Sequence, residues 1–215
     1  MALEFHVIPV TAFQQNCSLL ICSETRSAVL VDPGGDLEVI MHELERHKAK
    51  LKEIWLTHGH LDHAAASRTL ADRLKVPLIG PHEGDRFWLQ RLEMQARTYG
   101  MEAYAVFEPD RWLSDGEELH LEKYVFKVIH CPGHTPGHVV FYCASEGLII
   151  VGDVLFAGSI GRTDFPMSCH DDLIQAIKNK LFILPDNVVV APGHGRTTTI
   201  GKEKKHNPYV GQDAG

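Results

Sequence analysis

The sequence has 215 residues, of which 44% are hydrophobic and 23% charged, a composition typical of globular proteins. It excludes a disordered, collagen-like or coiled-coil chain, and the length predicts a single domain over residues 1–215. The formal net charge of −7 argues against a nucleic-acid partner. The apolar runs are too short to cross a bilayer, so we expect no membrane partner.

The N-terminus and the cysteines indicate the compartment. The chain begins Met-Ala-Leu-Glu-Phe-His and has neither a basic segment nor a long apolar segment typical of a secretory signal. Its five cysteines are odd in number and form no Cys-x-x-Cys pair. We therefore expect free thiols and a cytoplasmic location.

Short apolar runs predict the buried strands of a layered α/β protein, because most are continuous rather than alternating. The predicted strands are residues 17–22, 28–31, 54–56, 125–129, 138–143, 148–151 and 188–191. Apolar residues at helical spacing predict helices over 36–44, 62–75 and 168–181, the last beginning near Ser168. Residues 81–100 are amphipathic and rich in aromatic side chains. The tail after Gly201 is polar and is expected at the surface.

Residues 57–63 read Thr-His-Gly-His-Leu-Asp-His and lie between a predicted strand and a predicted helix. They offer imidazole nitrogens and a carboxylate, the ligands that zinc and similar ions prefer. A turn after the strand can aim His58 and His60 at one point. The start of the helix can aim Asp62 and His63 at a neighbouring point. A polar loop in which Asp62 only caps the helix is the weaker interpretation.

Three later residues occupy the same kind of position. His134, Asp153 and His194 each follow the carboxyl end of a predicted strand, where open α/β sheets gather their ligands. Together with residues 58–63 they bring the number of donors to seven. Seven donors are too many for one zinc ion and suit two divalent metal ions that share one bridging carboxylate.

The order and spacing of these donors resemble the metallo-β-lactamase fold superfamily. Within it, the chain is similar to type II glyoxalases, the hydroxyacylglutathione hydrolases, in their small single-domain YcbL-like form. The motifs that carry this likeness are Cys-Pro-Gly-His-Thr-Pro-Gly-His at 131–138, Gly-Asp at 152–153, Gly-Arg-Thr-Asp-Phe at 161–165 and Pro-Gly-His-Gly at 192–195. The resemblance implies an α/β fold, a four-layer αβ/βα sandwich with the metals at one edge.

The resemblance also implies a role for each donor. The expected ligands of the first metal are His58, His60 and His134. The expected ligands of the second metal are Asp62, His63 and His194, with Asp153 bridging the two ions. An Asp at the bridging position gives a site of nitrogen and oxygen donors only. We expect two zinc ions, with iron or manganese as the alternatives.

The implied reaction is hydrolysis of a glutathione thioester, S-D-lactoylglutathione in the type reaction, by a hydroxide held between the metals. Asp62 is expected to act catalytically by orienting this hydroxide. The thiolate leaves readily because a free thiol has a pKa of about 8.5. The candidates for contacts with the anionic substrate are Arg162, Lys202, Lys205 and Tyr209. Only about twenty residues follow His194, so we expect no C-terminal helical extension of the kind that binds glutathione in larger type II glyoxalases.

Other functions stay open at this point. A persulfide dioxygenase would hold one iron on His58, His134 and Asp153, and the motif at 161–165 is shared with that class. A lactonase or β-lactamase would use the same two metals. A metal-binding regulatory module would hold metal without catalysing a reaction. We expect a monomer or a small homo-oligomer. His138 is expected to support the loop that carries His134 rather than to bind metal.

Overall fold

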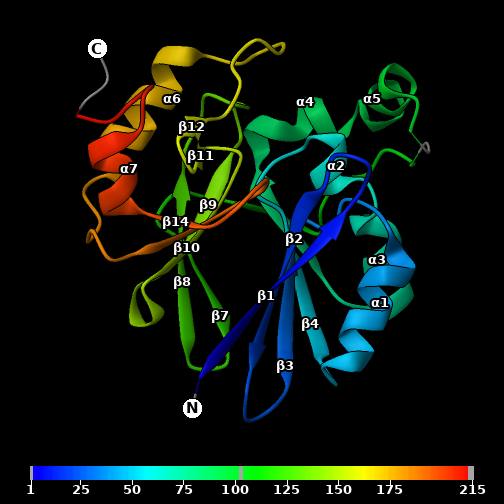
Figure 1. Ribbon diagram of the computed structural model, residues 1–215. Helices are drawn as coiled ribbons and strands as arrows, with labels where there is room; N and C mark the ends of the chain where they lie inside the picture. Colours follow the sequence, from blue (N-terminus) through cyan, green and yellow to red (C-terminus); the bar gives the residue numbers. More distant parts are fainter. Residues whose placement is uncertain (1, 102–103, 213–215) are drawn as a thin grey trace.

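The computed structural model describes residues 2–101 and 104–212. Two six-stranded sheets pack face to face, and helices cover the outer face of each sheet (Figure 1). This arrangement is the four-layer αβ/βα sandwich that the sequence predicts. Within the described residues, no helix is both long and apolar enough to span a bilayer.

The first sheet has the strand order β1-β2-β3-β4-β5-β6. Its strands are β1 (Leu3–Val10), β2 (Gln15–Cys22), β3 (Ser27–Val31), β4 (Lys50–Trp55), β5 (Leu78–His82) and β6 (Arg111–Leu113). β1, β2 and β3 pair antiparallel, whereas β3 to β6 pair parallel. The parallel part places the ends of β3, β4 and β5 at one edge of the sandwich.

The second sheet has the order β14-β13-β10-β9-β8-β7. Its strands are β7 (Glu118–Leu121), β8 (Tyr124–His130), β9 (Val139–Cys143), β10 (Leu148–Gly152), β13 (Val189–Pro192) and β14 (Thr198–Thr199). β10 and β13 are parallel and the other pairs are antiparallel. A small hairpin of β11 (Leu155–Phe156) and β12 (Ser159–Ile160) follows β10.

Helices form the two outer layers. On the first sheet lie α1 (Leu37–Arg46), α2 (Leu61–Ala64), α3 (Ser67–Leu74), α4 (Arg86–Leu89) and α5 (Leu92–Tyr99). On the second sheet lie α6 (His170–Ala176), the π-helical turn η3 (Ile177–Leu181) and α7 (Ile200–His206). Short 3-10 turns, η1 (Glu83–Asp85) and η2 (Ala144–Glu146), connect other elements.

The core between the sheets explains why the strands read as apolar runs. Trp55 of β4 contacts Phe126 of β8 and Phe141 of β9 at ring-centroid distances of 5.2 and 5.3 Å. All three side chains are fully buried. Because β2 and β3 also face helices on their other side, they are buried on both faces and cannot show alternation.

The predicted helix over 62–75 is wrong as a single helix. The chain forms α2 and α3 with a break at Ala65 and Ala66, where ψ of Ala66 is −5° and the helical hydrogen bonds are interrupted. The two helices pack on different partners. The carbonyl of Asp62 in α2 lies against Gly34, so closely that a Cβ at Gly34 would overlap it. α3 packs instead on β4 and β5. The break frees the start of α2 to serve the site.

The predicted surface tail after Gly201 is right only in part: Lys202, Lys205 and Tyr209 are exposed, but the segment also holds buried polar residues. Residues 200–206 form α7, in which Glu203 is 2% exposed, and Asn207 is fully buried. Glu203 accepts hydrogen bonds from Thr198 Oγ1, from Gly158 N and from Asn207 Nδ2 at 2.6, 2.9 and 2.9 Å. The polarity of Glu203 and Asn207 therefore reflects an internal hydrogen-bond network rather than exposure.

One further expectation needs correction. The cap of α6 is Cys169, because the Ser168 hydroxyl donates to the His134 carbonyl at 2.7 Å instead of capping the helix. The amphipathic segment 81–100, to which the sequence assigns no boundaries, contains the end of β5 and the short helices η1, α4 and α5. Strand β1 was not predicted, because it is an edge strand in which only Ile8 and Val10 are buried.

Candidate metal centre

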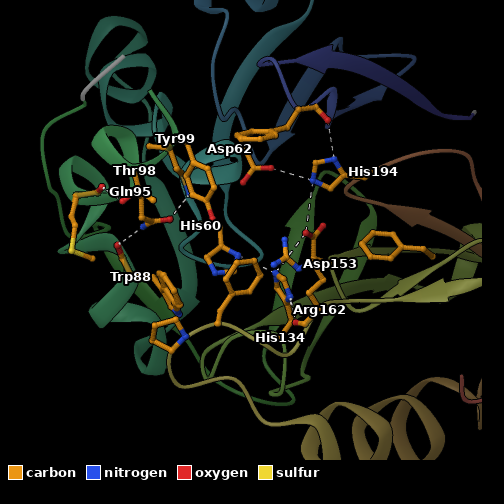
Figure 2. Close-up of a pocket in the computed structure, with 16 residues that line it drawn as sticks. His60, Asp62, Trp88, Gln95, Thr98, Tyr99, His134, Asp153, Arg162 and His194 are labelled. Carbon is orange, nitrogen blue, oxygen red and sulfur yellow. Dashed lines mark hydrogen bonds and ion pairs between the residues drawn. The ribbon is translucent and has the colours of Figure 1, made fainter. Parts of the chain in front are cut away.

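The predicted donors meet at the edge of the sandwich where parallel strands end. His58 and His60 follow β4, His134 lies in the loop between β8 and β9, and Asp153 and His194 follow β10 and β13. Figure 2 shows His60, His134, Asp153 and His194 approaching one another from different segments of the chain. The structure therefore brings together side chains that are far apart in sequence.

The first group of donors consists of His58, His60 and His134. One donor atom from each lies within 4.8 Å of the others. His60 Nδ1 and His134 Nε2 are 2.9 Å apart, and the His58 ring lies 4.8 Å from His60 and 5.0 Å from His134, centroid to centroid. All three are buried. This is a group of three imidazoles that could hold one metal ion.

The second group consists of Asp62, His63 and His194, whose donor atoms also lie within 4.8 Å of one another. His194 Nε2 is 3.1 Å from Asp62 Oδ2, and His63 Nε2 is 3.8 Å from the same oxygen (Figure 2 draws the first contact). Asp62 and His63 are adjacent because the first turn of α2 projects both. The group offers two imidazoles and a carboxylate to a second ion.

Asp153 lies between the two groups. Its Oδ1 is 3.3 Å from His63 Nε2, and its Oδ2 is 3.6 Å from His134 Nε2 and 3.8 Å from His194 Nε2. Gly193 makes this approach possible, because a Cβ at that position would overlap Asp153 Oδ1 and the His63 ring. One carboxylate is thus in reach of both groups, as a bridging ligand must be.

Buried polar atoms without partners show that the residues fit a metal. His58 Nε2, His60 Nε2, His63 Nε2 and Asp153 Oδ1 are buried, and none has a hydrogen-bond partner. An unsatisfied buried nitrogen or oxygen costs about 1–3 kcal/mol. Ligation of metal ions would satisfy these atoms, and the donor set of nitrogen and oxygen suits zinc, iron or manganese.

The pKa values of the donor residues bear on metal binding. Burial, with the neighbouring imidazoles, lowers the pKa of His58 and His60 well below the ordinary value, so both rings are neutral. Burial alone would raise the pKa of Asp153, but His63, His134 and His194 outweigh it and lower that pKa strongly. His58 and His60 therefore present neutral imidazoles, and Asp153 presents an ionised carboxylate. The carboxylates of Asp153 and Asp62 overcome burial and raise the pKa of His63 and of His194, so these two rings must lose a proton when they bind metal.

Asp32 is a functional residue that sequence reasoning missed. It is 2% exposed, and its carboxylate accepts hydrogen bonds from Thr57 N at 2.7 Å and Thr57 Oγ1 at 2.6 Å. The same carboxylate lies 2.9 Å from His63 Nδ1, and Thr57 Oγ1 lies 2.9 Å from His58 Nδ1. Asp32 thus orients one ring of each group. It follows the predicted strand at 28–31, so the rule that found Asp153 could have found it.

Asp85, at the end of η1, is a second missed residue. It is fully buried and accepts hydrogen bonds from Gly59 N at 2.8 Å, Thr135 Oγ1 at 2.8 Å and Gly137 N at 2.5 Å. Burial raises the pKa of Asp85 to about 7, although these hydrogen bonds oppose the shift. Asp85 joins the loop of His58 and His60 to the loop of His134. No motif in the sequence points to it.

The supporting role predicted for His138 agrees with its geometry. Its Nε2 accepts a hydrogen bond from Asp153 N at 3.1 Å, and its ring stacks on His58 at a centroid distance of 4.6 Å. Gly152 has φ of 47° and leaves room for this ring, because a Cβ there would crowd Thr57 Oγ1 and His138. His138 therefore holds the backbone that carries Asp153.

A cavity of about 490 Å³ opens beside the donors (Figure 2). We call it the aromatic cavity, and its lining residues are Phe13, His60, Leu61, Asp62, Trp88, Met94, Gln95, Thr98, Tyr99, His134, Asp153, Phe156, Arg162, Phe165, Pro166 and His194. Of the predicted substrate contacts, Arg162 lines this cavity. Lys202, Lys205 and Tyr209 are exposed on and after α7, and they are not among the lining residues.

Comparisons with known proteins agree with this geometry. A family model described as the metallo-beta-lactamase superfamily matches residues 10–194. The hydroxyacylglutathione hydrolase GloC of Haemophilus influenzae is 44% identical over 209 residues, which cover 97% of this chain and 98% of that protein.

Solved structures give the same result. The crystal structure of BLEG-1 B3 metallo-beta-lactamase superposes with a TM-score of 0.89 at 37% identity, covering 96% of this chain and 99% of that chain. The structure of TTHA1623 in a di-iron-bound form superposes with a TM-score of 0.86 at 34% identity, covering 95% and 100%. Membership implies divalent metal ions, although these relatives leave the metal open. The chain belongs to the metallo-beta-lactamase superfamily and is a metallohydrolase.

Proposed function

We propose that this metallohydrolase cleaves the thioester S-D-lactoylglutathione to D-lactate and glutathione. The observation that carries the proposal is the position of Asp153, whose carboxylate is in reach of both donor groups. The identity of 44% to a hydroxyacylglutathione hydrolase supports the choice of substrate. The reaction needs a nucleophile for the carbonyl, stabilisation of the oxyanion and a good leaving group.

We assign two divalent metal ions to the centre. His58, His60 and His134 would hold the first ion, and Asp62, His63 and His194 the second, with Asp153 shared between them. Zinc is the ion that we expect, because imidazole nitrogens and carboxylate oxygens, of which the donors supply five and two residues, are among its preferred ligands. Iron is the alternative that the di-iron form of TTHA1623 supports.

When bound, the ions would lower the pKa of water toward neutrality and place positive charge where the oxyanion develops. The carboxylate of Asp62 accepts a hydrogen bond from the attacking water and orients it toward the carbonyl of the substrate. His194 Nε2 lies 3.1 Å from this carboxylate, so the two side chains are close enough to hold the same ion. The carbon–sulfur bond breaks to release a thiolate, and a pKa of about 8.5 makes a strong general acid unnecessary.

The test pairs anaerobic metal analysis with hydrolysis of S-D-lactoylglutathione by the same preparation. We expect two ions per chain and release of free thiol. Asp153→Ala should lose metal and activity together, with a rate decrease of at least about a hundredfold. Asp72→Ala, on an exposed helix position, is the control and should change neither quantity.

Two outcomes would contradict the proposal. A fully metallated protein that releases no thiol would overturn the thioester substrate. Activity that survives in Asp153→Ala with metal retained would overturn the bridging assignment.

Hydrolysis of a β-lactam is a second candidate, because the chain is 37% identical to BLEG-1 B3 metallo-beta-lactamase. The same metals and the same Asp62 would serve an amide carbonyl in a ring. A β-lactam arm in the assay distinguishes the two substrates, and oxygen uptake with glutathione persulfide tests the dioxygenase alternative.

A further inference from the structure

Aromatic side chains line the aromatic cavity from the metal centre to the mouth. Trp88 meets the His60 ring edge to face at a centroid distance of 4.4 Å, and Phe165 lies 4.9 Å from the same ring. At the mouth, Phe13 and Tyr99 form an edge-to-face pair at 5.6 Å. Figure 2 shows Trp88 and Tyr99 on the side of the cavity away from Arg162. Aromatic surface therefore continues from the metal centre outward to the mouth of the cavity.

The cavity offers little to a charged group. Among the described residues that line it, Arg162 is the one Lys or Arg side chain. Its guanidinium donates two hydrogen bonds to Asp164, at 2.8 and 3.0 Å, and lies over the Phe165 ring at 4.5 Å. This cation is thus already paired, and it is exposed at the rim rather than buried in the wall.

These two facts determine which arm of a thioester fits. Glutathione carries two carboxylates and an ammonium group. Burying such charges against aromatic side chains that offer them no partner is unfavourable. The acyl arm of the thioester has no charge that needs a partner. A cavity of about 490 Å³ lies in the range of sites that hold drug-sized ligands, well beyond the needs of a three-carbon lactoyl group. A small acyl group would leave the half-exposed Tyr99 ring in contact with water.

Resting on the proposed function, we infer that the preferred substrates are acylglutathiones with a bulky apolar or aromatic acyl group. The acyl group lies against Trp88, Phe165 and Tyr99. The glutathione arm lies toward solvent at the rim, near Arg162. Tyr99 is then a specificity-determining residue of the acyl site, acting through its ring rather than its hydroxyl.

The experiment compares kcat/KM for two thioesters that share the glutathione carrier, S-D-lactoylglutathione and S-mandeloylglutathione, which adds a phenyl ring. We expect the phenyl substrate to be favoured by at least about tenfold, since even one methylene in an apolar pocket changes rates by about 10- to 200-fold. Tyr99→Ala should reduce this ratio at least about threefold, and Tyr99→Phe should keep it. Ile183→Ala, an exposed apolar residue outside the cavity lining, is the control and should not change the ratio.

The failures are distinguishable. If the metallated protein hydrolyses neither thioester, the proposed function fails. If it hydrolyses the lactoyl substrate and the phenyl ring brings no advantage, the proposed function stands and this inference is wrong. If the phenyl substrate is favoured but Tyr99→Ala leaves the ratio unchanged, the acyl group lies elsewhere and the inference is also wrong.

Discussion

Three imidazoles of the metal centre use one ring nitrogen for the fold and keep the other for the site. His134 Nδ1 donates to the Arg162 carbonyl at 2.8 Å, and His194 Nδ1 donates to the Phe13 carbonyl at 3.3 Å. His63 Nδ1 donates to Asp32 at 2.9 Å. Each bond holds the orientation of the ring and leaves Nε2 facing the centre, where it can bind metal once any proton on it is lost. The rings are therefore oriented before metal binds.

Asp85 holds the backbone of the loops by accepting hydrogen bonds from Gly59 N and Gly137 N. Asp85 can therefore be tested as a positioning residue. Asp85→Asn keeps the shape but replaces one acceptor oxygen with a donor NH2 group that faces an N–H. The variant should lose about 1–3 kcal/mol of unfolding free energy, because a buried donor loses its acceptor. Urea unfolding monitored by circular dichroism measures this loss.

The matched control for this change is Asp72→Asn, at an exposed helix position, which should unfold like the parent within about 0.5 kcal/mol. A metal titration should also show weaker binding in Asp85→Asn, because the loops of His58 and His134 lose their common anchor. Equal stability of Asp85→Asn and the parent would show that the three hydrogen bonds to Asp85 contribute nothing net.

At the level of elements, the ends of parallel strands gather the site. β4, β10 and β13 each deliver a donor in the first residues after the strand, and the short α2 adds Asp62 and His63. The break between α2 and α3 accompanies a change of packing partners. α2 packs on Gly34, whereas α3 packs on β4 and β5. The position of the break follows from packing partners that are remote in the sequence.

Helix α7 provides a second test at this scale. Glu203→Ala removes the acceptor of three hydrogen bonds in a buried position, so unfolding free energy should fall by about 3 kcal/mol. Lys202→Ala is the control on the same helix, and because Lys202 is exposed it should change stability by less than about 0.5 kcal/mol. Thermal and urea unfolding of both variants measure the difference. Indistinguishable curves would contradict a structural role for the carboxylate of Glu203.

At the level of the whole molecule, the centre joins the two sheets. His58, His60 and His63 come from the first half of the sandwich, and His134, Asp153 and His194 come from the second. Metal binding should therefore stabilise the packing of one half on the other. The expectations of a single domain, a cytoplasmic location and a monomer or small homo-oligomer stay predictions.

Removal of metal with a chelator should lower the melting temperature by about 5–10 °C. Binding at about 100 times Kd contributes about 2.7 kcal/mol, and about 1 kcal/mol shifts Tm by about 2–4 °C at this chain length. Calorimetry before and after chelation, and again after zinc is added back, measures the shift. Asp153→Ala should show a smaller difference between the two states. An unchanged Tm on chelation would contradict structural coupling of the centre to the fold.

Local signals in the sequence predict the seven candidate donors and the layered fold. Strand-like apolar runs ending in His134, Asp153 and His194 carry local signals, because the strand and the polar residue after it are adjacent in the chain. The seven donors of the site were all named from such signals, and the structure brings these side chains together.

The surroundings of those donors depend on contacts between distant segments of the chain. Asp32 and Asp85 act on loops that are remote in sequence, the aromatic cavity forms where α5 meets the turn after β1, and Glu203 and Asn207 of the polar segment after Gly201 are buried. A local pattern records the chemistry of a residue and the period of its own element. Hydrogen bonds and packing between distant segments leave no such record, because their partners are chosen only when the chain has folded.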